Sequence, residues 1–409
     1  MTKKSDAPAI RFKGFSDAWE QRKAKELFVS TADKGYPELP VLSATQDRGM
    51  IRRDENSINI FHDKKNEAGY KRVLPGQFVI HLRSFQGGFA HSAIEGITSP
   101  AYTVFGFSEP EKHDSEYWKY VFTSKSFIRR LETVTYGIRD GRSISYDEFL
   151  TLGFVYPSKA EQTAIARYLD KLSDLITLHQ RKFEKLTNVK KSMLEKMFPQ
   201  NGSSYPEIRF KGFTDPWEQR KLASLCEKFT DGDWIESKDQ SDFGVRLVQT
   251  GNVGVAEYLD KPNNKKWISE DTFDRLHCEE VLPGDILISR LPEPAGRACI
   301  MPLLGAKMIT AVDCTIVRTA PDMSNKFLVQ YLSSQAYFDD VNICLAGGTR
   351  QRISRGNLAN FDVPIPVKKS EQDAIGMFFG YLDNLITLHQ RELEKLQNIK
   401  KSMLEKMFV

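Results

Sequence analysis

The chain has 409 residues, of which 40% are hydrophobic and 27% are charged. These values are ordinary for a water-exposed globular protein, and the length predicts two or three domains that each bury a core. The opening residues hold no apolar run typical of a secretion signal, and no stretch of about 18 apolar residues predicts a membrane helix. We therefore expect a cytoplasmic protein without a membrane anchor.

The cysteine content and the charge distribution narrow the class of protein further. The five cysteines form no C-x-x-C pair, so we expect reduced, buried thiols and no disulfide framework or zinc site. The formal net charge is only +4. Residues 29–158 carry 16 basic and 16 acidic side chains, and residues 226–367 carry 15 and 20. If the chain binds nucleic acid, local loops and partner proteins must neutralise the phosphates.

The chain opens on a segment that occurs twice. IRFKGFSDAWEQRK at residues 10–23 returns as IRFKGFTDPWEQRK at residues 208–221. A Pro-Gly turn followed by an apolar run, which predicts a turn and a strand, occurs at residues 73–84 and again at residues 281–292. A period of about 200 residues is far too long for a stacked solenoid. We therefore expect two modules that share a skeleton.

Each module continues with a predicted helix, a basic glycine-containing loop and a short strand that ends in proline. The helical stretches are residues 114–134 and residues 325–345. The loops read YGIRDGRSIS and AGGTRQRIS, and the strands end in FVYP and VPIP. Because glycine lets the backbone approach another molecule closely, these loops are candidate binding elements.

The longest repeat follows each module. Residues 161–198 and residues 371–408 are identical at 25 of 38 positions. In both copies apolar residues alternate at spacings of four and three, which predicts about five heptads of a coiled-coil seam. A helix of this length spans roughly 57 Å at about 1.5 Å per residue. The central seam positions are Leu172, Ile176, His179, Phe183, Leu186, Leu382, Ile386, His389, Leu393 and Leu396.

Two near-identical helices in one chain pack most economically on each other. An antiparallel pair would have pseudo-twofold symmetry, with one module at each end, and would offer equivalent surfaces to two copies of another subunit. The histidine of each seam is expected to fix register and not to bind metal, because neither helix supplies a second ligand at suitable spacing. The sequence therefore predicts a mixed α/β protein, in which two globular domains of mixed sheet and helix are separated by an antiparallel coiled coil.

In this arrangement the sequence resembles the specificity (S) subunits of type I restriction-modification systems. The resemblance covers essentially the whole chain and rests on the paired P-x-I-R-F-K-G-F openings, the EQ-led helix repeats and the two dissimilar modules. It implies an N-terminal arm and a first target-recognition domain at residues 1–158, and a second recognition domain at residues 201–368. The long helices would occupy residues 159–200 and residues 369–409. Each recognition domain would read half of a bipartite, asymmetric DNA target, and the helix pair would set the unread gap.

The resemblance also implies partners. Two methyltransferase (modification) subunits would bind this chain, and restriction subunits with ATP-dependent endonuclease and translocase activity would join them on double-stranded DNA. S-adenosylmethionine for adenine methylation, and ATP with Mg²⁺ for cleavage, would belong to those subunits, with no cofactor on this chain. The residues agree with a non-catalytic role, because the chain has no G-x-x-x-x-G-K-[ST], H-E-x-x-H, G-x-G-x-x-G or [DN]-P-P-[YF] motif.

Base edges are read chiefly by arginine, lysine, asparagine and glutamine, on loops that a rigid scaffold holds. Such residues follow the predicted strand of each module, occupy both basic loops and occur in VQTGNVG of the second module. The candidate DNA-binding residues are Arg83, Ser84, Gln86, Arg139, Arg142, Gln249, Asn252, Arg290, Arg297, Arg350, Gln351, Arg352 and Arg355. Because half or more of protein–DNA hydrogen bonds go to the backbone, any one of them can equally be a phosphate anchor or a solvated loop residue.

Two other functions remain open from the residues alone. A metal-dependent nuclease would need a carboxylate–lysine cluster, and its nearest fragment, residues 284–287, contains Asp285 but lacks the lysine. A coiled-coil adaptor that binds only protein would explain the acidic balance of residues 226–367. Such an adaptor has no need for paired basic glycine loops in otherwise divergent modules.

Overall fold

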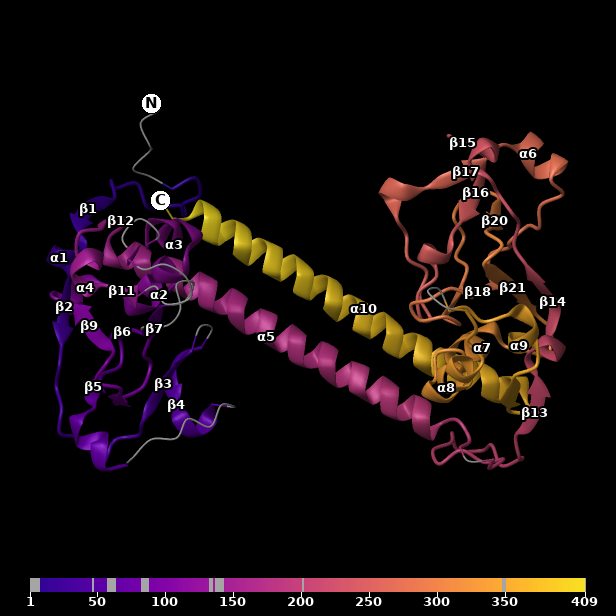
Figure 1. Cartoon of the computed structure of the whole chain (residues 1–409), viewed down its shortest axis with the longest axis horizontal. Helices are drawn as coiled ribbons and strands as arrows, with labels where there is room; N and C mark the ends of the chain where they lie inside the picture. Colours follow the sequence, from indigo (N-terminus) through magenta and orange to yellow (C-terminus); the bar gives the residue numbers. More distant parts are fainter. Residues whose placement is uncertain are drawn as a thin grey trace. The chain divides into compact units, whose positions relative to one another are not determined.

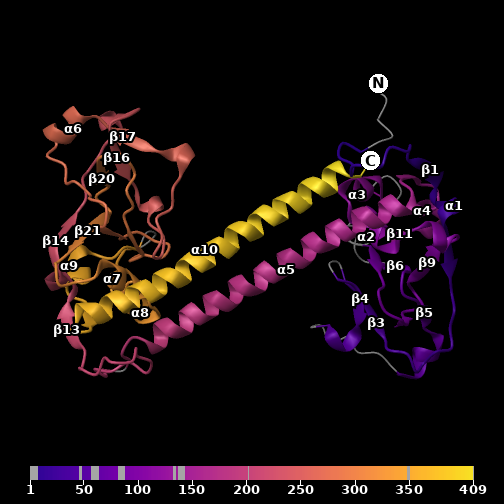
Figure 2. The ribbon, with the colours of Figure 1, turned by 180° about the vertical axis from the view of Figure 1, so that it is seen from behind.

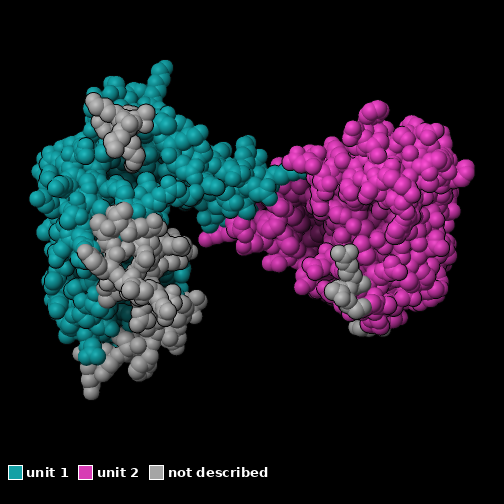
Figure 3. Space-filling view, turned by 45° about the horizontal axis from the view of Figure 1, so that its top comes forward, with its two compact units in different colours: residues 1–179, 391–409 teal, residues 180–390 magenta. Residues whose placement is uncertain are grey.

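The chain forms two compact units, which Figure 3 shows in different colours. Unit 1 comprises residues 1–179 and 391–409, and unit 2 comprises residues 180–390. Each unit therefore consists of one sequence module, the beginning of one long helix and the end of the other. The structure is a computed structural model, and it describes residues 8–45, 48–56, 64–81, 88–131, 135–136, 143–200, 202–347 and 351–408.

Unit 1 is built on a four-stranded antiparallel sheet, whose strands Figure 1 shows side by side. In spatial order they are β2 (Phe28–Thr31), β9 (Thr103–Phe107), β6 (Phe78–Ile80) and β7 (Phe89–His91). Two-stranded ribbons join β1 (Glu20–Lys23) to β12 (Gly153–Tyr156), β3 (Leu42–Thr45) to β4 (Gly49–Arg52), β5 (Lys71–Val73) to β8 (Gly96–Thr98) and β10 (Thr135–Tyr136) to β11 (Ser143–Ile144). Its short helices are α1 (Ala24–Leu27), α2 (Ser115–Thr123), α3 (Lys125–Leu131) and α4 (Tyr146–Phe149), with 3-10 turns at Arg53–Glu55, Lys64–Gly69 and Pro110–Lys112.

The core of unit 1 is an aromatic cluster. Phe78 and Phe122 meet edge to face with ring centroids 4.9 Å apart, and Phe28 meets Trp118 in the same way at 5.2 Å. Helix α2 starts where the Asp114 carboxylate accepts hydrogen bonds from two backbone N–H groups of its first turn. The cap fixes the helix so that its buried aromatic face packs against the sheet. Aromatic pairs in this geometry add to the free energy gained from burying their area.

Unit 2 contains two four-stranded sheets, which Figure 2 shows from behind. The antiparallel sheet has the order β14 (Cys226–Asp231), β21 (Cys314–Thr319), β18 (Ile286–Ser289) and β19 (Ala298–Ile300). The mixed sheet has the order β15 (Gln240–Ser241), β17 (Lys266–Ile268), β16 (Val245–Val248) and β20 (Met308–Thr310), and a ribbon joins β13 (Glu218–Lys221) to β22 (Asp362–Ile365). Its short helices are α6 (Glu270–Arg275), α7 (Asn325–Tyr331), α8 (Gln335–Ile343) and α9 (Arg355–Ala359), with 3-10 turns at Leu222–Leu225, Ser237–Asp239, Thr250–Asn252 and Pro262–Asn264.

The two units share one scaffold. The sheet β2-β9-β6-β7 of unit 1 and the sheet β14-β21-β18-β19 of unit 2 have the same strand order and the same antiparallel pairing. The helix pair α2–α3 recurs as α7–α8, with each position moved by 210 residues along the chain. The shift between the EQ-led repeats is also 210 residues, whereas β12 and β22, which lie between these elements, are related by a shift of 209 residues.

The long helices α5 (Lys159–Lys196) and α10 (Lys369–Lys406) run antiparallel within each unit. In unit 1 the Lys400 ammonium donates to the Ser173 hydroxyl at 2.8 Å, and in unit 2 the Lys190 ammonium donates to Asp383 at 2.5 Å. The ten central seam residues are all buried or half-buried. The predicted fold class, a mixed α/β protein with two long interacting helices, is confirmed.

Buried ion pairs explain why the opening segments and the EQ-led repeats occur together. In unit 1 the Arg11 guanidinium donates two hydrogen bonds to the Glu161 carboxylate, both 2.7 Å long. In unit 2 Arg209 donates to Glu371 in the same bidentate way, at 2.7 and 2.8 Å. Both carboxylates are almost completely buried, with 1% and 2% of the residue exposed. We call each pair a clamp, because it fastens an opening segment to the first turn of a long helix.

The glutamine of each EQ pair and the backbone of each opening segment complete this connection. The amide oxygens of Gln162 and Gln372 each accept a hydrogen bond, 2.9 Å long, from the backbone N–H of Asp114 and Ser324. These two residues are the N-caps of α2 and α7. The backbone N–H groups of Ile10 and Ile208 donate to the last turns of α10 and α5, respectively. The repeated sequences therefore form the contacts that connect each module to the long helices.

Candidate nucleic-acid interface

Six of the thirteen candidate DNA-binding residues lie outside the described residues and stay predictions. They are Arg83, Ser84, Gln86, Arg139, Arg142 and Arg350. The other seven candidates are described, and all of them belong to unit 2.

The structure brings the three candidate loops of unit 2 together at one end of the antiparallel sheet, where strand β18 ends and strand β19 begins. We define this three-loop edge as residues 249–257, 290–297, 344–347 and 351–355. The first two loops meet where Arg297 Nε donates to the Val253 carbonyl at 2.6 Å. The second and third meet where the Ile353 backbone N–H donates to the Arg290 carbonyl at 3.2 Å. Loops that are far apart in the sequence therefore form one surface.

Arg297 connects the first and second loops of this edge through hydrogen bonds to their backbone. Its guanidinium donates only to backbone carbonyls, and burial lowers its pKa. These hydrogen bonds give Arg297 a loop-holding role, and its predicted base contact stays a prediction. The accepting carbonyls belong to Thr250, Val253, Leu291 and Pro294, at 2.6 to 2.9 Å.

Asn252 and Arg290 are also internal. Asn252 is 2% exposed, accepts from the Gln249 backbone N–H at 3.0 Å and donates to the Leu259 carbonyl at 2.9 Å. Arg290 is 8% exposed and donates to the Val312 carbonyl at 2.6 Å. Their side chains fix the path of the loops, and the base-reading role that the sequence predicted for them stays a prediction. Gln249 is half-buried beside them.

Three candidates are exposed at the three-loop edge: Gln351, Arg352 and Arg355. Arg352 lies 3.8 Å from the Asp313 carboxylate and Arg355 lies 3.7 Å from Asp231. Both guanidinium groups are about half exposed, with 62% and 46% of the side chain accessible. Ion pairs this long and this exposed contribute little free energy, so either arginine can exchange its carboxylate for a base edge or a phosphate.

The sequence analysis missed the two carboxylates that orient these arginines. Asp231 ends strand β14, and Asp313 immediately precedes strand β21. Asp231 also lies 3.5 Å from Arg290, so one carboxylate contacts a buried and an exposed arginine. No motif marks either residue, because their role depends on strand ends that are more than 80 residues apart in the chain.

The fragment nearest to a nuclease motif has a structural role. Asp285 is 3% exposed and accepts two hydrogen bonds from Arg318, both 2.8 Å long, and one from the Leu282 backbone N–H. Its oxygens are therefore engaged within unit 2. Within the described part of the chain, no three His, Cys, Asp or Glu side chains gather as a metal site requires.

Sequence comparison finds proteins that are similar to this chain. Residues 214–398 match the family model of the type I restriction modification DNA specificity domain. The type I restriction enzyme MjaVIII specificity subunit of Methanocaldococcus jannaschii is 22% identical over 264 residues, which cover 61% of this chain and 59% of that protein. The putative type I restriction enzyme MjaX specificity subunit of the same organism is 22% identical over 413 residues, which cover 94% of this chain and 92% of that protein.

Solved structures show the same fold. The S subunit of a type I restriction-modification system from M. genitalium superposes with a TM-score of 0.61 at 14% identity, over 98% of this chain and 99% of that one. A chain from a study of complex assembly and conformational transition of the type I R-M system superposes with a TM-score of 0.50 at 15% identity, over 95% and 97%. Among the described residues, no helix is long and apolar enough to cross a membrane. The chain is therefore similar to the specificity subunits of type I restriction-modification systems and shares their fold, and residues 214–398 match the DNA specificity domain of that family.

Proposed function

We propose that this chain reads a bipartite, asymmetric DNA sequence, with one half-site for each unit, and that it carries no catalytic activity of its own. The observation that carries the proposal is the pairing of a shared scaffold with different loops. The two units repeat one sheet order and one clamp, and they differ in the loops that the scaffold holds. A repeated scaffold with different reading loops suits a target with two different halves.

The exposed arginines of the three-loop edge would read the half-site of unit 2. Arginine recognises guanine through two parallel hydrogen bonds in the major groove. Arg352 and Arg355 lie where the third loop contacts a rigid sheet. The backbone at these residues is therefore fixed, while their guanidinium groups stay accessible. In unit 1 the proposed readers remain Arg83, Ser84, Gln86, Arg139 and Arg142.

The long helices would connect the two readers and dock the partner subunits. Both are 38 residues long and continuous from one unit into the other, which supports a role in setting the unread gap. Two methyltransferase subunits would bind this chain, and restriction subunits would complete the assembly. S-adenosylmethionine, ATP and Mg²⁺ would act on those partners.

Methylation mapping tests this proposal. The chain is combined with its cognate methyltransferase and S-adenosylmethionine, and the methylated positions of a random DNA library are sequenced. We expect a single asymmetric motif in two parts with a fixed gap. A continuous motif, a palindrome or methylation without sequence preference would overturn the proposal, and methylation by this chain alone would overturn its non-catalytic part.

A substitution then tests the reading loop. Arg352→Ala is expected to cost about 1–3 kcal/mol of binding free energy and to relax the motif at one base position, if the guanidinium is bidentate to guanine. The matched control is Lys238→Ala, which removes an exposed cation of unit 2 away from the three-loop edge. If Arg352 holds only a phosphate, binding weakens evenly across sequences and the salt slope falls by about one.

A further inference from the structure

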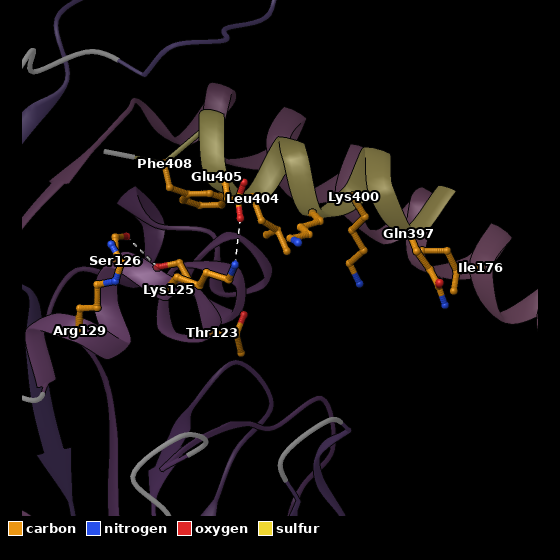
Figure 4. Close-up of a pocket in the computed structure, with 12 residues that line it drawn as sticks. Thr123, Lys125, Ser126, Arg129, Ile176, Gln397, Lys400, Leu404, Glu405 and Phe408 are labelled. Atoms are coloured by element: carbon orange, nitrogen blue, oxygen red, sulfur yellow. Dashed lines mark hydrogen bonds and ion pairs between the residues drawn. The ribbon is translucent and has the colours of Figure 1, made fainter. Parts of the chain in front are cut away.

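Unit 1 contains a pocket of about 650 Å³ between the α2–α3 corner and the last turns of α10. Figure 4 shows its lining, with Leu404 of α10 and Phe408, just after the end of that helix, beside the corner residues Thr123–Arg129. Ile176 of α5 completes the apolar part of the wall. The volume suits several side chains of a bound molecule.

The charged groups of this pocket are mostly cations. Lys125, Arg129, Lys400 and Lys401 line it together with a single carboxylate, Glu405. Lys125 donates to Glu405 at 3.0 Å, but 64% of the lysine side chain and 47% of the glutamate side chain are exposed. An ion pair in such contact with water is weak, so it leaves Lys125 available to an incoming anion.

Lys400 is the least exposed of the four cations. Its ammonium donates to the Ser173 hydroxyl at 2.8 Å and lies 5.7 Å from the centre of the Tyr120 ring. Burial, with a smaller contribution from the positive charge of Lys119, lowers its pKa. The surroundings of this ammonium supply only part of the negative charge that would balance it. A carboxylate that enters the pocket would supply the rest.

The corresponding corner of unit 2 has the opposite charge. The shift of 210 residues that relates α2–α3 to α7–α8 pairs Lys125 with Gln335 and Arg129 with Asp339. The Gln335 amide donates to the Asp339 carboxylate at 2.8 Å. The counterpart of Lys400 is Lys190, which already pairs with a carboxylate of α10. The scaffold is therefore the same in both units, while the charge at this corner is reversed.

The reversal argues against a DNA-backbone site, given the proposed function on which this step rests. Phosphate contacts position a protein on DNA without reading sequence. If both units dock on DNA through the same scaffold, positions that bind phosphate should be cationic in both. The corner is cationic only in unit 1, and its hollow has an apolar wall that a phosphate backbone would not fill.

We propose that this pocket receives an acidic segment of a protein partner, with carboxylates on the four cations and an apolar side chain against Leu404 and Phe408. Because unit 2 carries Asp339 at the equivalent corner, the same segment is accepted by unit 1 alone. The two units are then distinguishable to protein partners, although the helices and clamps of both units are nearly identical.

A binding measurement on the full chain tests this. The probe is a short fluorescein-labelled helical peptide with glutamates on one face and leucines on the other, followed by fluorescence anisotropy. The variant K125Q/R129D gives unit 1 the residues that unit 2 already has, so the fold is expected to tolerate them. We expect it to weaken peptide binding about tenfold or more. A peptide with glutamines in place of the glutamates should bind the wild-type chain about tenfold more weakly as well.

The matched control is the reciprocal variant Q335K/D339R, which should bind the peptide at least as tightly as the wild-type chain. Equal binding by the wild-type chain and K125Q/R129D, or an equal loss in both double variants, would overturn the proposal. Two results together would identify the pocket as a DNA-backbone site and would also overturn the proposal. They are displacement of the peptide by random-sequence duplex DNA, and a smaller salt dependence of DNA binding in K125Q/R129D than in the wild-type chain. The DNA motif of K125Q/R129D, mapped as above, reports separately on the proposed function.

Discussion

The two units reach the same scaffold with cores of different chemistry. In unit 1 the face of the main sheet is covered by phenylalanines, among them Phe78, Phe105 and Phe122, which stack or meet edge to face. In unit 2 the equivalent core is largely aliphatic, with Ile286, Ile288 and Val317 on its strands. Core packing requires volume and apolar character, and several combinations of residues satisfy both. The core can therefore change along with the loops that it supports.

The clamp residues, which connect each module to a long helix, should tolerate far fewer substitutions than the core. Each clamp needs a bidentate donor and a buried carboxylate at two positions that are about 150 residues apart. A substitution at either position leaves a buried charge without a partner, which costs far more than a change in core packing. The comparison between the units therefore separates the repeated residues that build the scaffold from the residues in which the two units differ.

Removing a clamp carboxylate should have the largest effect on stability. Glu371→Ala leaves Arg209 without its bidentate partner and should lower the free energy of unfolding by about 3–5 kcal/mol. Glu161→Ala should cost less, because Glu371 also accepts a hydrogen bond from the Trp217 indole at 3.4 Å. In unit 1 the Trp19 indole nitrogen is buried without a hydrogen-bond partner among the described residues.

Urea unfolding of both variants measures this difference, with Glu270→Ala as the control. Glu270 is exposed and lies 3.6 Å from Lys307, so its removal should change stability by less than about 1 kcal/mol. If Glu161→Ala destabilised the chain more than Glu371→Ala, the comparison of the two clamps would be wrong.

A smaller effect is expected where the two seams differ. Asp383 accepts hydrogen bonds from Lys190 and Gln330, whereas the equivalent position of unit 1 is Ser173. Asp383→Ser replaces a charged acceptor of two hydrogen bonds, from half-buried Lys190 and buried Gln330, by a single shorter hydroxyl group, and should cost about 1–3 kcal/mol. Ser173→Asp supplies Lys400 with a carboxylate and should cost less than Asp383→Ser. Thermal unfolding of the two single variants decides the order, and equal losses would contradict the account.

The smallest difference should appear in the response to acid. Burial lowers the pKa of His91 and of His113 in unit 1. Both therefore bind protons more readily when unfolded, so unit 1 loses stability as the pH falls below the unfolded value of about 6.5. In unit 2 burial raises the pKa of Asp233, so the folded state binds the proton more readily and acid favours it.

Hydrogen exchange resolved by peptide measures each unit separately. Protection of β6 and β9 should fall between about pH 7.5 and about pH 5.5 more steeply than protection of β18 and β21. His91→Gln should reduce the slope in unit 1, and His277→Gln, which alters an exposed residue of unit 2, is the control. A steeper acid response in unit 2 than in unit 1 would contradict this assignment.

Sequence repeats predicted the long helices and the two-module organisation well, because a helical seam is encoded locally in spacings of three and four residues. The clamps could not be predicted in the same way, since Arg11 and Glu161 meet only after a whole module has folded between them. The hydrogen bonds of Arg297 could not be predicted for a related reason. Its donors are oriented by carbonyls of two other loops, and a basic residue near glycine looks the same in a sequence whether it faces inward or outward.

The most direct test of the account replaces residues 226–367 by the matching block of a homologous specificity subunit, and maps the methylated motif of the hybrid with the same methyltransferase. The exchange keeps Arg209, Glu371 and both long helices, so the scaffold of unit 2 should form around the new reader. We expect one half of the motif to change while the other half and the gap stay as they are. A change in both halves, or in the gap alone, would contradict the independence of the two units.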